Sequence, residues 1–333
     1  MVAGLPATTA FARTLGCASR AGFRVRANLT GVNDPDVVLR QGPWQHRMVP
    51  AHGTRIHAAL TGPEDGPLVV LLHGFPQCWY TWRRQMTDLA GSGYRVAALD
   101  LRGYGASDKP PGRYDIPVLA GDVAAVIRSL GAADAAVVGQ GLGGVVAWSM
   151  PALTPDVVSG VGVLGSPHPS HLHRTVARSA PVSTLRWLSR VQVPWFPERA
   201  MTRGPMVRQV LDAWSAPGWN CADAEFYEHA MRLPFSAHSA MEQVRWLVRS
   251  APRSDGRAYR RTVAPPARVP VLSLHGRADR FLPPAATALD RKRTAVGYHR
   301  VVIEGAGRFL TEEAPEEVSA ALTRWLTWLN QGD

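Results

Sequence analysis

Cysteine is scarce in this sequence and long apolar runs are absent, and each scarcity excludes a class of protein. The three cysteines, Cys17, Cys78 and Cys221, are widely spaced, which argues against a disulfide framework and a metal cluster and fits a reducing cytoplasm. No apolar run approaches the roughly 18 residues of a membrane span. We therefore expect a cytoplasmic protein with no transmembrane span, no metal and no cofactor.

Lysine is nearly absent, which changes the interpretation of the net charge of +11. The cations are 35 arginines and two lysines, a ratio typical of a GC-rich coding bias that adds arginine without selection for phosphate contacts. The excess lies in two segments, with +4 over residues 1–47 and +7 over 168–262. Because the charge belongs to a tail and an insert, we do not expect nucleic acid as a partner.

Acidic residues are missing from the first 33 positions. The arginines there stand among small residues in a pattern that faintly resembles a transit peptide, and Thr14 to Cys17 faintly resembles a lipoprotein site. Neither pattern follows a proper apolar core. We therefore predict that residues 1–44 are a disordered tail, or that an upstream start codon has been taken for the true one.

From Gln45 onward the sequence alternates between predicted strands and helices. An exposed edge strand is predicted at 55–60, buried strands at 68–73, 95–99, 135–138, 158–164, 269–275 and 298–303, and helices at 82–90, 120–130, 145–150 and 315–329. Apolar strands that alternate with helices indicate an α/β fold with a doubly wound, mostly parallel sheet. The predicted core is residues 45–167 and 263–333.

The alternation stops between residues 168 and 262, where the chain reads as helical throughout. An insert of this kind between two sheet strands predicts a helical cap. We expect the cap to cover the carboxyl ends of the strands, where such sheets bind ligands.

A glycine cluster marks the candidate active site. The segment from Val138 to Gly144 lies between a predicted strand and a predicted helix, which is the position of a nucleophile elbow, a turn of the pattern small-x-nucleophile-x-small. Gly139 and Gly143 supply the small residues. The nucleophile position is Gly141, which has no side chain.

Several further motifs together identify a family resemblance over residues 41–330. They are His73-Gly74-Phe75-Pro76 followed by Trp79 and Trp82-Arg83, the loop from Asp100 to Asp108, Gly165 to Pro169, His275 to Asp279, and Gly305-Ala306-Gly307. With these motifs the chain resembles the epoxide hydrolase and haloalkane dehalogenase branch of the α/β-hydrolase superfamily. It is most similar to actinobacterial proteins described as epoxide hydrolases.

The resemblance implies a nucleophile, a histidine and an acid as catalytic residues, and this chain retains only the acid. The family has an Asp nucleophile, usually after a His, where this chain has Gly141 and Gln140, and a His where it has Arg308. Asp279 matches the family's acid. Glycine has no atom with which to attack, and an arginine cannot accept a proton from water. We therefore predict that the covalent route is lost.

The resemblance also implies groups that bind the substrate oxygen. The oxyanion hole is expected from the backbone N–H groups of Phe75 and Leu142, which do not depend on side chains. The family's cap supplies two tyrosine donors, and the only tyrosines of this cap are Tyr227 and Tyr259.

Replacement of the histidine predicts one specific contact. Without its histidine, Asp279 would be a buried, unpaired charge, which costs several kcal/mol. Arg308 stands at the histidine position, so we predict an ion pair between Asp279 and Arg308.

Three other patterns have simpler interpretations than a catalytic one. Ser166 is a conceivable substitute nucleophile, but no elbow surrounds it and Pro167 follows. The alternating His168, His171 and His173 have no carboxylate cluster nearby in sequence, so we do not expect zinc. The tryptophans that stand among arginines between 187 and 246 are predicted to be core aromatics beside a solvated basic face.

Three hypotheses for function remain open. The first is a pseudoenzyme that binds a small apolar molecule or a protein partner without turnover. The second is an active hydrolase of epoxides or esters, or a non-hydrolytic catalyst, that uses other pocket residues. The third is a basic module that binds acidic surfaces. Several ionisable side chains near Gly141 would favour the second, and a pocket filled by its own side chains would favour a structural role.

Overall fold

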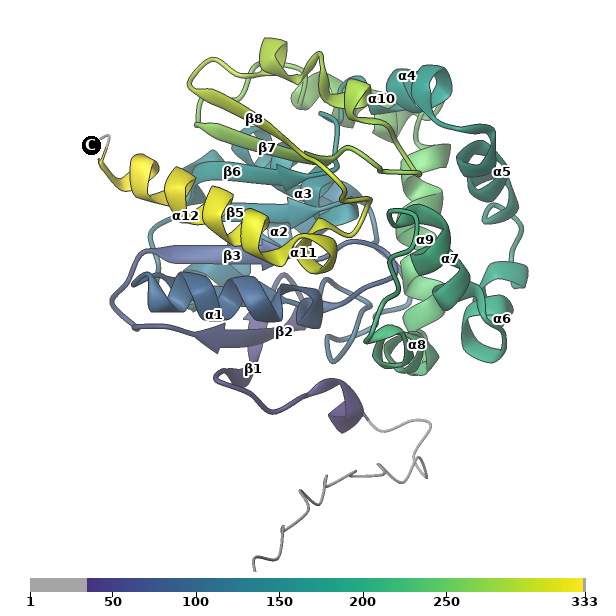
Figure 1. Ribbon diagram of the computed structural model, residues 1–333, viewed down its shortest axis with the longest axis horizontal. Coiled ribbons are helices and arrows are strands. Elements are labelled where there is room, and N and C mark those ends of the chain that lie inside the picture. The colour runs from purple at the N-terminus through teal and green to yellow at the C-terminus, as the bar shows by residue number, and fades with distance from the viewer. Residues whose placement is uncertain (1–34, 332–333) are drawn as a thin grey trace, which may run out of the picture. The chain divides into compact units, whose positions relative to one another are not determined.

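The structure is a computed structural model that describes residues 35–331, and an eight-stranded sheet forms its centre (Figure 1). The strands are β1 Gln45–Ala51, β2 Thr54–Thr61, β3 Leu68–Leu72, β4 Arg95–Leu99, β5 Ala135–Gln140, β6 Val158–Leu164, β7 Val271–Gly276 and β8 Tyr298–Ile303. Their order is β1-β2-β4-β3-β5-β6-β7-β8. The β1–β2 and β2–β4 pairs are antiparallel and the other pairs are parallel. The predicted doubly wound, mostly parallel sheet is confirmed.

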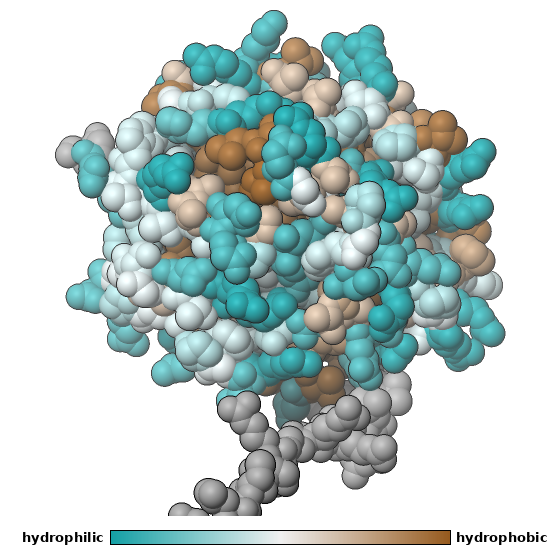
Figure 2. All heavy atoms as spheres, in the orientation of Figure 1, coloured by the Kyte–Doolittle hydropathy of each residue, from teal (hydrophilic) through white to brown (hydrophobic). Residues whose placement is uncertain are grey.

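Helices cover both faces of the sheet. Helices α1 (Arg83–Gly91) and α12 (Pro315–Gln331) pack together on one face, and α2 (Ile116–Ser129) and α3 (Leu142–Leu153) on the other (Figure 1). Short helical turns complete the core: η1 Pro35–Val38, η2 Trp79–Trp82, η3 Pro155–Val157, η4 Pro284–Thr287, η5 Asp290–Arg293 and α11 Leu310–Glu313. On the face with α1 and α12, polar side chains dominate and apolar ones form separate patches (Figure 2).

Seven helices fill the insert between β6 and β7. They are α4 Leu172–Ser179, α5 Val182–Arg190, α6 Phe196–Arg203, α7 Met206–Trp214, α8 Ala224–Arg232, α9 Ser236–Arg249 and α10 Ser254–Thr262. Helices α4 to α9 lie at one end of the sheet (Figure 1). We call residues 168–262 the helical insert. None of the helices between residues 35 and 331 has both the length and the hydropathy that crossing a membrane requires.

Strand prediction succeeds where the chain is apolar and fails at the sheet edge. The bounds of β4, β6 and β8 are those predicted, because these runs are bounded by clear breaks. The prediction of an exposed edge strand is wrong: β2 lies inside the sheet between β1 and β4, and residues 56–59 are buried. Strand β1 was not predicted, since most of its residues are exposed and its sequence, from Gln45 to Ala51, has little apolar character.

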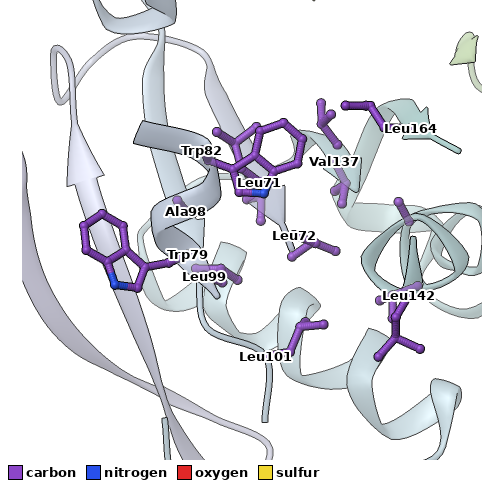
Figure 3. Packing of buried hydrophobic residues seen from close by; sticks show 14 of the residues in the cluster. Leu71, Leu72, Trp79, Trp82, Ala98, Leu99, Leu101, Val137, Leu142 and Leu164 are labelled. Carbon is purple, nitrogen blue, oxygen red and sulfur yellow. The ribbon is translucent and has the colours of Figure 1, made fainter. Parts of the chain in front are cut away.

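The core is continuous from the sheet into η2. Trp79 and Trp82 are completely buried and lie among leucines of β3 and β4 (Figure 3). The indole N–H of Trp79 donates to the Val38 carbonyl at 2.9 Å.

The predicted tail over residues 1–44 needs correction at its end. Residues 1–34 lie outside the described part of the chain, but residues 35–44 are part of the folded structure. Val38 is fully buried, and the Trp44 ring meets the Trp79 ring edge-on with centroids 5.2 Å apart. Arg40 forms an ion pair with Asp223 of the helical insert at 3.6 Å. These contacts could not be predicted from local pattern, because their partners are distant along the chain.

Candidate active site

The turn between β5 and α3 has the backbone geometry of a nucleophile elbow. Gly141 has φ +56° and ψ −114°, a conformation that strains any residue with a side chain. A Cβ on Gly139 would lie 2.2 Å from the carbonyl carbon of Gly143, so the flanking position requires glycine. The turn is therefore intact although its central residue offers no nucleophile.

Arg308 occupies the space next to this turn. A Cβ built on Gly141 would lie 3.3 Å from Nη2 of Arg308, so the guanidinium is in tight contact with the position at which a side chain would begin. Nη1 of Arg308 donates to Oδ2 of Asp279 at 3.2 Å and to the Gly165 carbonyl at 2.5 Å. Its Cζ lies 4.7 Å from the centre of the Phe281 ring. The predicted Asp279–Arg308 ion pair is confirmed.

Both carboxylate oxygens of Asp279 have partners within the protein. Its Oδ1 accepts from the backbone N–H groups of Phe281 at 2.8 Å and Leu282 at 3.0 Å, and Nε2 of His275 lies 3.3 Å from Oδ2. Burial tends to raise the pKa of Asp279, but the Arg308 charge and the His275 contact outweigh it and hold that pKa below the ordinary value. Asp279 is thus a paired carboxylate at neutral pH.

Glu313 fixes the loop that carries Arg308. Its carboxylate accepts three backbone N–H groups, from Gly307 at 2.8 Å, Phe309 at 2.7 Å and Ala216 at 2.8 Å. Burial raises the pKa of Glu313, and these three donors oppose that shift. Sequence reasoning missed this residue. The available signal was an acid a few residues after the Gly305-Ala306-Gly307 motif.

Gln140 joins a buried polar network that holds one of the predicted tyrosine donors. Its Nε2 donates to Gln77 at 2.9 Å, and Gln77 donates to Glu312 at 2.9 Å. Glu312 also accepts from Arg83 at 2.6 Å and from the Tyr227 hydroxyl at 2.6 Å. The network was missed by sequence reasoning because it joins residues far apart in the chain.

Neither tyrosine of the helical insert reaches the candidate site, which corrects the expectation that they donate there. The Tyr227 hydroxyl is held by Glu312, and the Tyr259 hydroxyl lies 2.7 Å from the Ser149 hydroxyl. Burial raises the pKa of both phenols. Both tyrosine rings are buried with their hydroxyl groups hydrogen-bonded, which is usual for buried tyrosines.

A cavity of about 500 Å³ separates the elbow from the helical insert. It is walled by aromatic rings in contact: the ring centroids lie 4.8 Å apart for Trp187 and Trp214 and 4.3 Å apart for Trp214 and Phe281. Aliphatic residues complete the walls, among them Leu142, Val145, Leu172, Val176, Leu185, Leu188, Val244, Leu247 and Val248. Arg308 and Gly141 line its inner end, so the cavity is an apolar chamber with a cation at one end.

The expected oxyanion hole opens into this cavity. Phe75 and Leu142 both line it, and Leu142 is the first residue of α3, whose N–H has no acceptor within the helix. Over residues 35–331, the N–H groups of Phe75 and Leu142 have no acceptor. They are available to a carbonyl oxygen or an anion.

The remaining candidates have structural partners. Ser166 donates to the Gly141 carbonyl at 2.6 Å, so it braces the elbow. Nε2 of His171 lies 2.9 Å from Asp290 and Nε2 of His173 lies 2.5 Å from the Leu247 carbonyl. His168 packs edge-on against Trp148. His168 and His171 thus share Asp290, which also accepts the His168 backbone N–H at 3.1 Å, whereas His173 has a different partner.

Comparison with known proteins agrees with the fold and the motifs. Residues 67–315 match the family described as alpha/beta hydrolase fold. The chain is 30% identical to the AB hydrolase superfamily protein YfhM of Bacillus subtilis, over 84% of this chain and 97% of that protein. It is 31% identical to epoxide hydrolase A of Mycobacterium tuberculosis, over 86% and 99%. The solved epoxide hydrolase from an endophytic Streptomyces superposes with a TM-score of 0.73 at 27% identity, covering 87% of this chain and 97% of that one.

Proposed function

Because the chain belongs to the α/β-hydrolase fold family and is epoxide hydrolase-like, we propose from its site that it binds a small apolar ligand without hydrolysing it. The observation that carries the proposal is the pair of substituted positions. Gly141 leaves the elbow without a nucleophile, and Arg308 replaces the base and pairs with Asp279. The helical insert would act as the cap over the bound ligand.

The chemistry of the cavity lining supports a binding role over catalysis. Among the described residues that line it, only Arg308 and His173 carry ionisable side chains. A guanidinium has no acceptor and cannot act as a base. The His173 ring nitrogen Nε2 is bonded to the Leu247 carbonyl, and burial lowers the pKa of this histidine. Nδ1 of His173 is buried without a partner, so this ring is the one group of the described lining that could accept a proton. The lining holds no Asp or Glu that could act as the nucleophile beside it.

The size of the cavity supports a ligand over a purely structural role. Its volume of about 500 Å³ falls within the range of roughly 300–1,000 Å³ that is usual for small-molecule sites. A pocket whose task was only structural would be filled by its own side chains. The walls of this one leave room for a ligand of moderate size.

The test is hydrolysis of an aryl epoxide and of p-nitrophenyl esters by the purified native protein at pH 7–8. We expect rates equal to those of buffer alone, because Gly141 offers no nucleophile at the elbow. Turnover well above the buffer rate would contradict the proposal. Loss of such turnover in His173→Ala would then identify the base.

A further inference from the structure

Arg308 has more hydrogen-bond donors than the protein satisfies. A guanidinium carries five N–H donors, and both hydrogens of Nη1 are used, one by Asp279 and one by the Gly165 carbonyl. Over the described residues 35–331, Nη2 and Nε of Arg308 have no acceptor. The side chain is 11% exposed and lines the cavity. Three donors thus remain for a ligand inside a largely apolar chamber.

The same end of the cavity offers further donors and no competing acceptor charge. The free N–H groups of Phe75 and Leu142 line it together with Arg308, and Leu142 lies at the positive end of the α3 dipole. Asp279 is not among the lining residues, and its carboxylate is covered by the contacts of Arg308, His275 and two backbone N–H groups. A ligand in the cavity can therefore contact the N–H groups of Arg308 but not the carboxylate of Asp279.

The rest of the cavity limits what an anion can be. Its walls are mostly aromatic and aliphatic, and the described lining contains one guanidinium and four other polar side chains, those of Ser166, His173, Ser189 and Gln192. Such a site cannot compensate the desolvation of a dianion. A planar monoanion that accepts two parallel N–H bonds fits one guanidinium edge, and a carboxylate has this geometry.

We propose that the ligand of this cavity is the anion of an apolar monocarboxylic acid. Its carboxylate would accept from Nη2 and Nε of Arg308 and from the N–H groups of Phe75 and Leu142, and its hydrocarbon part would lie between Trp187, Trp214 and the helical insert. This inference rests on the proposed non-hydrolytic binding function, and names the class of ligand. It gives the residue that replaced the catalytic base a role in recognition.

The test compares three probes of equal chain length by calorimetric titration at pH 7.5. They are octanoate, octan-1-ol and octylammonium, which share the apolar body and differ in the charge of the head group. Hydrogen bonds to a charged group predict that octanoate binds about ten-fold or more tightly than octan-1-ol. Octylammonium should bind more weakly than octan-1-ol, because the donors would face a cation.

Variants assign the preference to Arg308. In the double variant Asp279→Asn/Arg308→Met both partners of the buried pair lose their charge together, so neither is left unpaired. We expect it to bind octanoate no more tightly than octan-1-ol, with octan-1-ol binding preserved. The matched control is Arg277→Met, whose arginine pairs with Glu304 on the surface, outside the cavity. This control should keep the preference for octanoate.

Three outcomes would overturn the inference. If the native protein binds octanoate and octan-1-ol equally well, the proposed ligand is a neutral apolar molecule, and the proposal of a carboxylate is wrong. A preference for octanoate that survives in Asp279→Asn/Arg308→Met would place the anion elsewhere. If none of the three probes binds, the proposal of a carboxylate ligand is wrong. The proposed non-hydrolytic function is tested separately, because its failure would appear as hydrolysis in the epoxide and ester assay.

Discussion

At the scale of single residues, the two substituted catalytic positions depend on each other. Arg308 lies so close to Gly141 that a side chain there would meet its guanidinium. In turn, Arg308 supplies the charge that Asp279 needs once a histidine is absent. The glycine frees the elbow from side-chain strain and leaves space for the arginine. These residues form one arrangement, in which Arg308 pairs with Asp279 beside a glycine at the elbow.

The ion pair predicts a distinctive pattern of stabilities. Arg308→Met leaves the Asp279 carboxylate buried without its cation, so we expect the free energy of unfolding to fall by about 3–5 kcal/mol. The double variant Asp279→Asn/Arg308→Met removes both charges and should lose less than the single variant. Urea unfolding at pH 7 measures both. Equal losses in the two variants would contradict a direct pairing.

A second prediction at this scale concerns acid. Burial, with the nearby charges of His171 and Arg293, lowers the pKa of His168 to about 3, whereas a histidine in the unfolded chain titrates near about 6.5. Below that pH the unfolded state takes up a proton that the folded state does not. Stability should therefore fall as the pH decreases from about 6.5 towards 3, by about 1.4 kcal/mol per pH unit from this residue.

The effect is measured as the free energy of unfolding at pH 7 and at pH 5. The native protein should lose about 2 kcal/mol more over this interval than His168→Gln, which has no titrating ring. Other buried histidines contribute equally to both proteins, so the difference isolates His168. An identical loss in the two would mean that the ring is protonated in the fold.

At the scale of elements, contacts between segments that are distant along the chain hold the helical insert against the rest of the protein. The segment of residues 35–44 covers Trp79 and reaches the helical insert through Arg40. Glu313 in α11 holds the Arg308 loop against the insert through the N–H of Ala216. The loop that carries Arg308 is thus tied to the helical insert, which borders the cavity.

The packing of residues 35–44 predicts a cost when its tryptophan is removed. Trp44→Ala removes the edge-on contact with Trp79 and uncovers part of that ring, so we expect a loss of about 1–3 kcal/mol in the free energy of unfolding. The matched control is Trp195→Ala, because Trp195 is 85% exposed. The control should change stability by no more than about 0.5 kcal/mol. Similar losses in the two variants would contradict the packing role of the segment.

At the scale of the whole molecule, the sequence predicts what depends on local pattern. Apolar runs such as 95–99 and 158–164 indicate strands buried on both faces, and the structure has them there. The elbow and the Asp279–Arg308 pair were also within reach, because the motifs fix which loops meet at the carboxyl ends of the strands.

The missed features all join segments that are distant along the chain. Gln77 and Glu312 meet although 235 positions separate them, and no local pattern marks such a pair. The positions of Tyr227 and Tyr259 likewise depend on the partners that Glu312 and Ser149 offer their hydroxyl groups. Local periodicity places a residue on an element but does not decide which distant polar group it finds.

The measurement that tests the central claim most directly is ester hydrolysis by four proteins: the native chain, Gly141→Ser, Arg308→His, and the double variant. Esters suit this scaffold better than epoxides, because the N–H groups of Phe75 and Leu142 have no acceptor within residues 35–331 whereas the tyrosines are bonded elsewhere. Serine would restore the nucleophile, and histidine, oriented by Asp279, the base. If the two substitutions account for the loss of catalysis, only the double variant turns over p-nitrophenyl butyrate above the buffer rate. If the native chain or Arg308→His hydrolyses the ester as fast as the double variant, the claim that Gly141 and Arg308 prevent hydrolysis is wrong.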